Sequence, residues 1–263
     1  MTPSDSRPPR LSSLIQRATA ADDSPPFSDG ALIDPHRSLV WLGEAAALVS
    51  PTEAEFVVDP DARGEGHGTA MLEHLLFTGD RLFWAHGDHP AARALAASHG
   101  LEPVRTLLHL EAPVVDGHSH GTRPFTVDDA DALLALNARA FAHHPEQGGM
   151  TRADLDAVMT EPWFEADDVL LLWDDTELIG FCWLKVVDGE GEFYVVGVSP
   201  DRQGQGLGRQ LMDAGFARLA GRGIRVAHLY VEGDNTPALA LYTSLGFTQR
   251  SIDVQYRQKV TER

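Results

Sequence analysis

A glycine-rich segment, residues 203–209, follows a valine-rich run that ends at Ser199-Pro200. Beyond it, Leu207, Leu211 and Phe216 have the spacing of an amphipathic helix. Glycines allow a ligand to approach the backbone closely, and a helix N-terminus carries partial positive charge. The order strand, glycine-rich loop, helix therefore predicts a site for an anionic group, although a tight turn without a ligand would show the same loop.

The spacing of this loop separates it from two other phosphate-binding loops. A Walker loop would end in Gly-Lys-Ser/Thr, where this chain has Arg209-Gln210. A dinucleotide fold would show G-x-G-x-x-G within a parallel βαβ unit. Here the pattern is G-x-G-x-G after Gln203, which resembles the acetyl-CoA pyrophosphate loop of the GNAT acetyltransferase superfamily.

A second motif, N-x-x-A-x-x-L-Y-x-x-x-G-F over residues 235–247, is similar to the last helix of a GNAT domain. Asn235 is expected to cap the start of this helix, and Gly246 to end it in the left-handed conformation. The two motifs in this order and at this distance indicate a GNAT domain. The fold class that the resemblance implies is α/β (α+β), with a mixed, mostly antiparallel sheet flanked by helices.

Both motifs occur twice. Residues 56–68 match residues 196–208 at an offset of 140, and residues 84–101 match residues 230–247 at an offset of 146. Two nearly equal offsets indicate an internal duplication. We predict a disordered tail over 1–12, a degenerate first GNAT domain over 13–110, a linker over 111–123 and a catalytic second GNAT domain over 124–263. We expect His118 and His120 in the linker to be solvated rather than metal ligands.

Secondary structure is predicted from patterning and caps. The first domain should have a helix over 13–22 and strands over 39–42 and 45–49. In the second domain we expect a strand over 124–127, a helix over 128–142 capped by Asp128, and a helix over 151–159 with a Thr-x-x-Asp cap. A hairpin over 169–173 and 178–187, a strand over 192–198, a helix over 207–221, a strand over 226–231, a helix over 236–245 and a strand pair around 247–256 should follow.

Composition narrows the class of protein. The chain has 263 residues, 43% of them hydrophobic, and its net charge of -18 disfavours a nucleic-acid partner. One cysteine, Cys182, excludes an internal disulfide framework and fits a reducing compartment. No apolar run is long enough to span a membrane, and the Pro- and Ser-rich start does not resemble a signal peptide. We therefore expect a cytoplasmic protein without membrane association, and a monomer.

Five further stretches extend the resemblance: residues 143–151, 161–164, 180–185, 191–198 and 229–236. In this order on a duplicated GNAT chain, they resemble the mycothiol synthase family. That family acetylates the cysteinyl amine of a cysteinyl–glucosaminyl–inositol precursor, a pseudodisaccharide, in the last step of making mycothiol. The resemblance implies contacts to this substrate from Asp29, Glu146, Lys185, Glu192 and Tyr230.

The resemblance also implies the catalytic roles. Glu192 would be the general base for the amine, directly or through a water, and Tyr242 the acid that protonates the departing thiolate. Thr52 and Ala96 stand at the matching positions of the first domain. Because neither can replace the base or the acid, we expect the first domain to bind acetyl-CoA, or to have once done so, without catalysing transfer. Direct attack by the amine is favoured over an acetylated Cys182.

Acetyl-CoA is the expected co-substrate, and no metal is expected. In the second domain the backbone of Val196 and Val198 would hold the pantetheine arm, and the loop amides the pyrophosphate. The full cofactor set there is Val196, Gly197, Val198, Gln203, Gly204, Gln205, Gly206, Leu207, Gly208, Arg209, Asn235, Thr236, Pro237, Ala238, Leu239 and Ala240. The first-domain set is Phe56, Val57, Val58, Gly64, Glu65, Gly66, His67, Gly68 and Thr69.

Two other functions stay open from the residues alone. One is a GNAT acetyltransferase for another amine, such as a protein N-terminus or an aminoglycoside, whose positive charge would suit the acidic surface. The other is a non-catalytic module that senses acetyl-CoA, since one domain already lacks the catalytic pair. Glu192 and Tyr242 argue against this second alternative.

Overall fold

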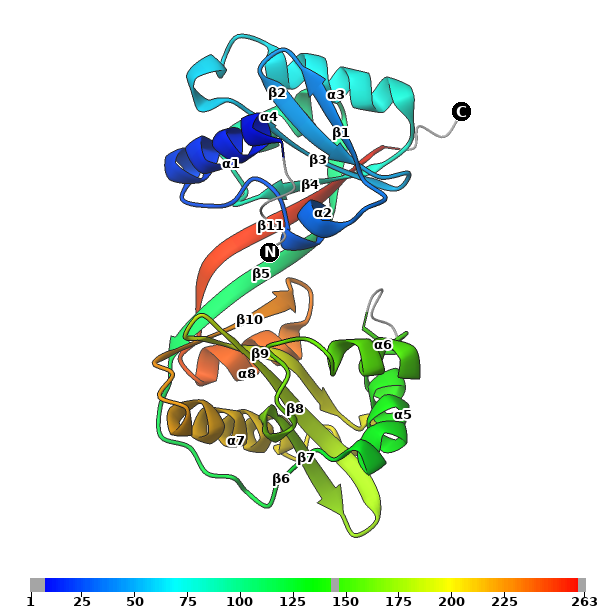
Figure 1. Cartoon of the computed structure of the whole chain (residues 1–263), viewed down its shortest axis with the longest axis vertical. Coiled ribbons are helices and arrows are strands. Elements are labelled where there is room, and N and C mark those ends of the chain that lie inside the picture. The colour runs from blue at the N-terminus through cyan, green and yellow to red at the C-terminus, as the bar shows by residue number, and fades with distance from the viewer. Residues whose placement is uncertain (1–7, 143–146, 260–263) are drawn as a thin grey trace. The chain divides into compact units, whose positions relative to one another are not determined.

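The computed structural model of this chain describes residues 8–142 and 147–259, except the side chain of Asp29. It divides into two compact units (Figure 1). Unit 1 comprises Met1–Leu108, Glu232–Asp234 and Arg250–Arg263, and unit 2 comprises His109–Val231 and Asn235–Gln249. Three strands therefore contribute residues to both units: β5 (Leu101–Pro113), β10 (Val226–Glu232) and β11 (Thr248–Gln258).

Unit 1 is a mixed sheet between two pairs of helices. Its strands are β1 (Ser38–Leu42), β2 (Ala45–Val49), β3 (Glu53–Val58) and β4 (Leu82–His86), followed in the sheet by the unit 1 parts of β11 and β5. Strands β3 and β4 are parallel, and β4 and β11 are antiparallel. The helices are α1 (Pro9–Asp22), α2 (Asp29–Ile33), α3 (His67–Thr78) and α4 (Pro90–Ser98).

The alternation of side chains along β2 builds two cores in unit 1. Ala45 and Ala47 face a cluster that includes Met71 of α3 and Ala96 of α4. Ala46, between them in the chain, faces the opposite cluster, which α1 and α2 supply with Leu11, Leu14, Ala18 and Ala31. The sheet is therefore covered on both faces.

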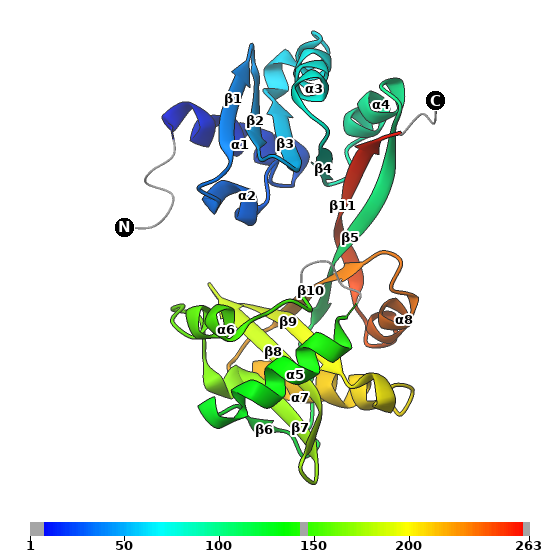
Figure 2. The same ribbon diagram turned by 90° about the vertical axis from the view of Figure 1, so that its right-hand side faces the viewer.

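Unit 2 repeats this architecture. Its strands run in the order β5, β10, β9 (Glu190–Val198), β8 (Glu177–Val187), β7 (Val169–Asp174) and β6 (Arg123–Pro124). Pairing is antiparallel from β6 to β9 and parallel between β9 and β10. The helices are α5 (Ala130–Ala140), α6 (Arg152–Val158), α7 (Leu207–Gly221) and α8 (Thr236–Ser244), and Figures 1 and 2 show α5 and α6 on the face of β7–β9 opposite α7.

Close backbone approach explains why α7 packs tightly on β8 and β9. Gly215 of α7 lies against Phe193 and the sulfur of Cys182, where a Cβ atom would clash with the Phe193 ring. Gly191 of β9 lies under Leu219 of α7 in the same way. On the other face, Leu133 of α5 and Leu155 of α6 pack against Phe181 and Trp183, among other core residues.

Most predicted elements are present, with four differences. Helix α1 begins at Pro9, and α5 begins at Ala130 because a capping box between Thr126 and Asp129, rather than Asp128, organises its start. The expected strand over 124–127 is only β6, and the final strand pair is the single strand β11. Residues from Arg250 onward belong to unit 1, where the predicted boundary had placed them in the second domain, because β11 pairs with β4.

The segment predicted as a linker packs along α7 within unit 2. Val114 N–H donates to the Arg225 carbonyl over 2.8 Å, and Gln210 Nε2 donates to the His120 carbonyl over 2.7 Å. His118 and His120 are exposed, as expected, and His120 also lies 3.4 Å from an Asp213 carboxylate oxygen. No helix in the described part of the chain is long and apolar enough to cross a membrane.

Candidate active site

The glycine-rich loop of unit 2 leads directly into α7. Gly204 and Gly206 have φ values of +76° and +81°, a conformation that favours glycine, and no atom lies within 4 Å of where a Cβ would be. Gly206 caps α7 without a side-chain hydrogen bond, and the first turn holds no acidic residue. The first amides of α7 are therefore not capped by a side chain, as a phosphate-binding helix start requires.

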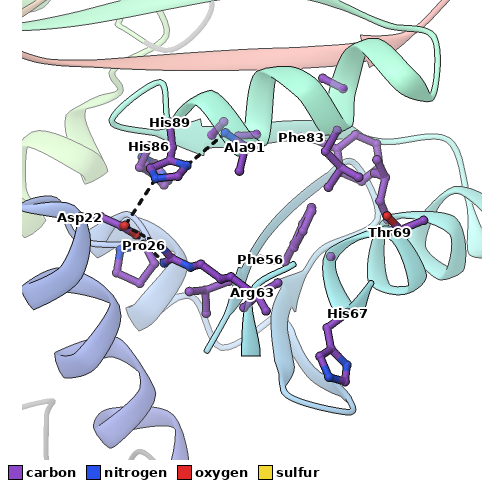
Figure 3. Close-up of a pocket in the computed structure, with 18 of the residues that line it drawn as sticks. Asp22, Pro26, Phe56, Arg63, His67, Thr69, Phe83, His86, His89 and Ala91 are labelled. Carbon is purple, nitrogen blue, oxygen red and sulfur yellow. Dashed lines mark hydrogen bonds and ion pairs between the residues drawn. The ribbon is translucent and has the colours of Figure 1, made fainter. Parts of the chain in front are cut away.

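Unit 1 repeats this geometry at α3. Gly64 and Gly66 have φ values of +81° and +91°, and Gly66 caps α3 without a side-chain hydrogen bond. A cavity of about 400 Å³ adjoins this helix start, large enough for part of a ligand such as acetyl-CoA (Figure 3). Every first-domain residue predicted to bind acetyl-CoA lines it except Glu65.

The cavity of unit 1 also contains charged residues that the sequence did not single out. Arg63 in the loop donates two hydrogen bonds of 2.7 Å to Asp22 (Figure 3). His86 contacts Glu55 and Asp253 over 3.1 and 3.2 Å. Burial lowers the pKa of His86, but the two carboxylates raise it by more, to about 9. The imidazole is therefore charged at neutral pH.

Strands β9 and β10 separate in the middle of unit 2. They pair only at Ala227 with Gly191 and at His228 with Glu192. Ser199 N–H donates to the Ile179 carbonyl of the β8 side over 2.9 Å. The backbone N–H and C=O groups of successive residues point alternately to the two sides of a strand. Those of Val196 and Val198 therefore point away from β8, toward the side where β10 has parted from β9. These are the two residues predicted to hold the pantetheine arm.

Glu192 and Lys185 stand opposite each other on β9 and β8, so their side chains share one face of the sheet. Glu192 is half-buried, and this burial raises the pKa of its carboxyl group, while the positive charge of Lys185 opposes the rise. A carboxylate with a raised pKa is a stronger base than an exposed one.

Two aromatic rings surround the Lys185 ammonium. Its Nζ lies 5.2 Å from the ring centre of Trp163 and 5.7 Å from that of Tyr194. The β8–β9 register shifts by one residue here, between the pairs Trp183–Val195 and Leu184–Phe193. Tyr194 is the additional residue of this bulge, and its proximity to Glu192 is seen in its pKa, which burial and the Glu192 charge raise.

Tyr242 lies on the other face. Phe193 follows Glu192 in β9 and so points away from it. The Phe193 ring lies 5.1 Å from Phe216 of α7 and 6.0 Å from Phe247, whose ring lies 5.7 Å from Tyr242. Burial first, and then the nearby Cys182, raise the pKa of Tyr242 to about 12. Its hydroxyl therefore stays protonated at neutral pH and available as a donor.

Three further predictions concern Tyr230, the two ends of α8, and the pair Asp29 and Glu146. Tyr230 lies on the Glu192 face of β10, two residues beyond His228, and its side chain is 49% exposed. Asn235 caps α8 by accepting a hydrogen bond from Ala238 N–H, and Gly246 has φ +86° as expected. Glu146 and the side chain of Asp29 lie outside the described residues, so their roles stay predictions.

Sequence reasoning missed several residues on the acceptor face, by which we mean the face that carries Glu192. The Trp163 ring faces Lys185 as well as Trp183. His109 and His228 were not singled out. The structure joins them by a contact of 3.2 Å beside Tyr230. Only strand register could have revealed them, because their positions in the chain are 119 residues apart.

Comparison with known proteins agrees with this geometry. Residues 133–247 match the family described as Acetyltransferase (GNAT) family. A mycothiol acetyltransferase of Clavibacter michiganensis is 52% identical over 78% of this chain and 72% of its own, and one of Kytococcus sedentarius is 42% identical over 97% and 95%. A GCN5-related N-acetyltransferase from Sphaerobacter thermophilus, 20% identical, superposes with a TM-score of 0.71 over all of this chain and 96% of its own, which shows the same fold.

The match to the Kytococcus relative covers nearly the full length of both chains, which shows the family to which this chain belongs. The chain belongs to the mycothiol acetyltransferase family, acetyl-CoA-dependent N-acetyltransferases with the GNAT fold.

Proposed function

We propose that unit 2 transfers the acetyl group of acetyl-CoA to the cysteinyl amine of the cysteinyl–glucosaminyl–inositol precursor of mycothiol. This proposal rests on the position of Glu192 at the last pair before β9 and β10 part, with Tyr242 on the opposite face of the sheet, where Phe247 connects it to Phe193. A base on one face and a proton donor on the other suit an amine that attacks from one side while a thiolate leaves on the other.

The co-substrate would be held mainly by backbone groups. The amides at the start of α7, behind Gly204 and Gly206, suit a pyrophosphate, and the groups of Val196 and Val198 that face the split suit the amides of a pantetheine arm. Backbone donors of this kind bind the anion locally, which matters in a chain with a net charge of -18.

Glu192 would take the proton of the acceptor ammonium. A free α-amino group has a pKa of roughly 7.7–8.0, so only about a tenth is neutral at pH 7. Converting all of the amine to its neutral form costs about 1.4 kcal/mol at pH 7. A carboxylate of raised basicity can offset this cost by accepting the proton. The neutral amine then attacks the thioester carbonyl directly, and Tyr242 donates its proton to the sulfur as the C–S bond breaks. The acetylated nitrogen loses its extra proton to solvent, from which Tyr242 is reprotonated.

A covalent route through Cys182 has less support. The Cys182 side chain is fully buried, and this burial raises the pKa of its thiol far above the usual range. Nucleophilic attack needs the thiolate. We therefore propose that Cys182 packs against Gly215 of α7 and carries no acetyl group.

Recognition of the pseudodisaccharide would use side chains of the acceptor face. Lys185 and Tyr230 offer an ammonium and a hydroxyl to the hydroxyl-rich sugar and inositol rings. Asp29 and Glu146 are proposed as further contacts, on the family resemblance alone.

For unit 1 we propose acetyl-CoA binding without transfer. The cavity beside Gly64 and Gly66 supports binding. Ala96, which occupies the position of Tyr242, lines this cavity and has no proton to donate. We further propose a cytoplasmic monomer, in keeping with a lone buried cysteine.

The decisive experiment incubates the protein with acetyl-CoA and the cysteinyl–glucosaminyl–inositol precursor. It measures the release of CoA and the mass of the product. A gain of one acetyl group on the amine supports the proposal. Acetyl-CoA binding without turnover would overturn the proposed substrate, and aminoglycosides and peptide N-termini would be assayed next.

A further inference from the structure

A row of polar side chains crosses three neighbouring strands on the acceptor face. His109 on β5 contacts His228 on β10, with 3.2 Å between Nε2 of His109 and Nδ1 of His228. His228 is the register partner of Glu192 on β9, and neighbouring strands lie about 4.8 Å apart. His228 therefore stands beside the proposed base, and His109 lies one strand further away.

The His109 ring also stacks on Tyr230. The two ring centres are 4.4 Å apart and the planes are 12° from parallel. His228 meets the same tyrosine edge-on, at 6.3 Å and 88°. Tyr230 is 49% exposed and lies beyond the last register pair of β9 and β10, so its ring packs on the β5 side, against His109.

The contact between the histidines fixes the stack. One of the two facing nitrogens must donate and the other must accept, so the rings keep a defined mutual orientation of 79°. With His109 held in this way, its flat face packs against one side of the Tyr230 ring. Aromatic pairs of this kind contribute beyond the area they bury.

We propose that His109 and His228 are positioning residues that hold Tyr230 against the acceptor, and so contribute to recognition of the acceptor rather than to the chemical step. This rests on the proposed function, because Tyr230 is taken to contact the pseudodisaccharide. His109 acts through Tyr230, and His228 acts through His109.

The kinetic test compares His109→Ala, which removes the stack, with His109→Phe, which keeps a flat ring but loses the contact to His228. We expect His109→Ala to raise the KM for the acceptor roughly three- to tenfold, the range of an aromatic pair, with kcat and the KM for acetyl-CoA changed less than about twofold. His109→Phe keeps a stacking ring but loses the contact to His228, so its acceptor KM should lie between the wild-type value and that of His109→Ala. His118→Ala, at an exposed histidine of the same unit, is the control. An unchanged acceptor KM in His109→Ala, or equal losses for both substrates, would overturn the proposal.

A second measurement needs no turnover. The chain has four tyrosines, so fluorotyrosine labelling of the full chain gives a simple ¹⁹F spectrum in which Tyr230→Phe identifies the Tyr230 signal. That signal should move most in His109→Ala, move less in His109→Phe, and not move in His118→Ala. If the wild-type protein fails to acetylate the precursor but the signal moves as stated, the proposed function fails while the positioning of Tyr230 stands. If the signal does not respond to His109→Ala, the positioning fails.

Discussion

Lys185 and Glu192 face each other across β8 and β9. Burial and the Lys185 charge have opposite effects on the pKa of the Glu192 carboxyl group. Burial raises the pKa of Glu192, and the Lys185 ammonium, held near Trp163 and Tyr194, lowers it. The basicity of the proposed base is therefore set by a balance that a single substitution can shift.

Lys185→Met should move the acid limb of the pH profile to higher pH. Without the ammonium, burial acts unopposed and the pKa of Glu192 rises further, so the carboxylate is lost at a higher pH as the solution is acidified. The measurement is kcat/KM for the acceptor from about pH 5 to about pH 9. Lys259→Met, at an exposed lysine of unit 1, is the control and should keep the wild-type profile. A limb that stays in place would contradict this account.

Glu192→Gln should depress turnover most at low pH. The acceptor amine is largely protonated there and depends on the base, whereas at high pH a growing fraction is already neutral. General base catalysis typically contributes about 10²–10⁴-fold, and the loss should shrink as the pH rises. The check is the ratio of wild-type to variant kcat across the same pH range. A ratio independent of pH would remove Glu192 as the base.

Tyr242→Phe should lower kcat by about 10²–10⁴-fold while the KM for acetyl-CoA changes little. The ring keeps its packing against Phe247, so only the proton donor is lost. Steady-state kinetics and a direct acetyl-CoA binding measurement separate the two effects. Tyr256→Phe, which removes a hydroxyl in unit 1, should leave kcat near the wild-type value. Normal turnover in Tyr242→Phe would mean that another group protonates the sulfur.

The parts of the site that lie within a single motif could be predicted from sequence. Gly204, Gly206 and Gly246 have the positive φ values, and Asn235 the cap, that their local patterns indicate. Such features depend on a few consecutive residues. The helix over 207–221 has the predicted bounds for the same reason.

The acceptor face could not be predicted in this way, because it depends on register between distant strands. The bulge at Tyr194 and the contact between His109 and His228 arise only when β5, β10, β9 and β8 are aligned. The same holds for β11, which pairs with β4 although more than 160 residues separate the partners, as Gly87 and Asp253 do in their hydrogen bond. Local patterns carry no signal for such pairings.

Protonation of His86 should make the stability of the protein depend on pH between about 6.5 and about 9. The folded state raises the pKa of His86 from 6.5 to about 9, so its stabilisation is complete below pH 6.5 and is lost as the pH rises through 9. The shift corresponds to roughly 3 kcal/mol at most. Chemical denaturation of wild type and His86→Gln at pH 6 and above about pH 9 is the test. The difference in unfolding free energy between them should shrink at high pH, and His74→Gln, at an exposed histidine, should follow the wild type. A constant difference would contradict the charged His86.

Ala96→Phe should remove acetyl-CoA from unit 1 and leave catalysis in unit 2 intact. The Ala96 side chain is buried at 5% exposure and lines the 400 Å³ cavity, so an aromatic ring there occupies space that the proposed ligand needs. Titration calorimetry should give two acetyl-CoA sites per chain in the wild type and one in the variant, with kcat changed less than about twofold. Ala97→Phe places the same ring on the exposed side of α4 and should keep both sites.

Because overpacking of a core costs about 1–3 kcal/mol, thermal unfolding of both variants shows whether a lost site reflects a filled cavity or a weakened unit. A single site in the wild type, or two in Ala96→Phe, would show that this cavity does not bind the co-substrate.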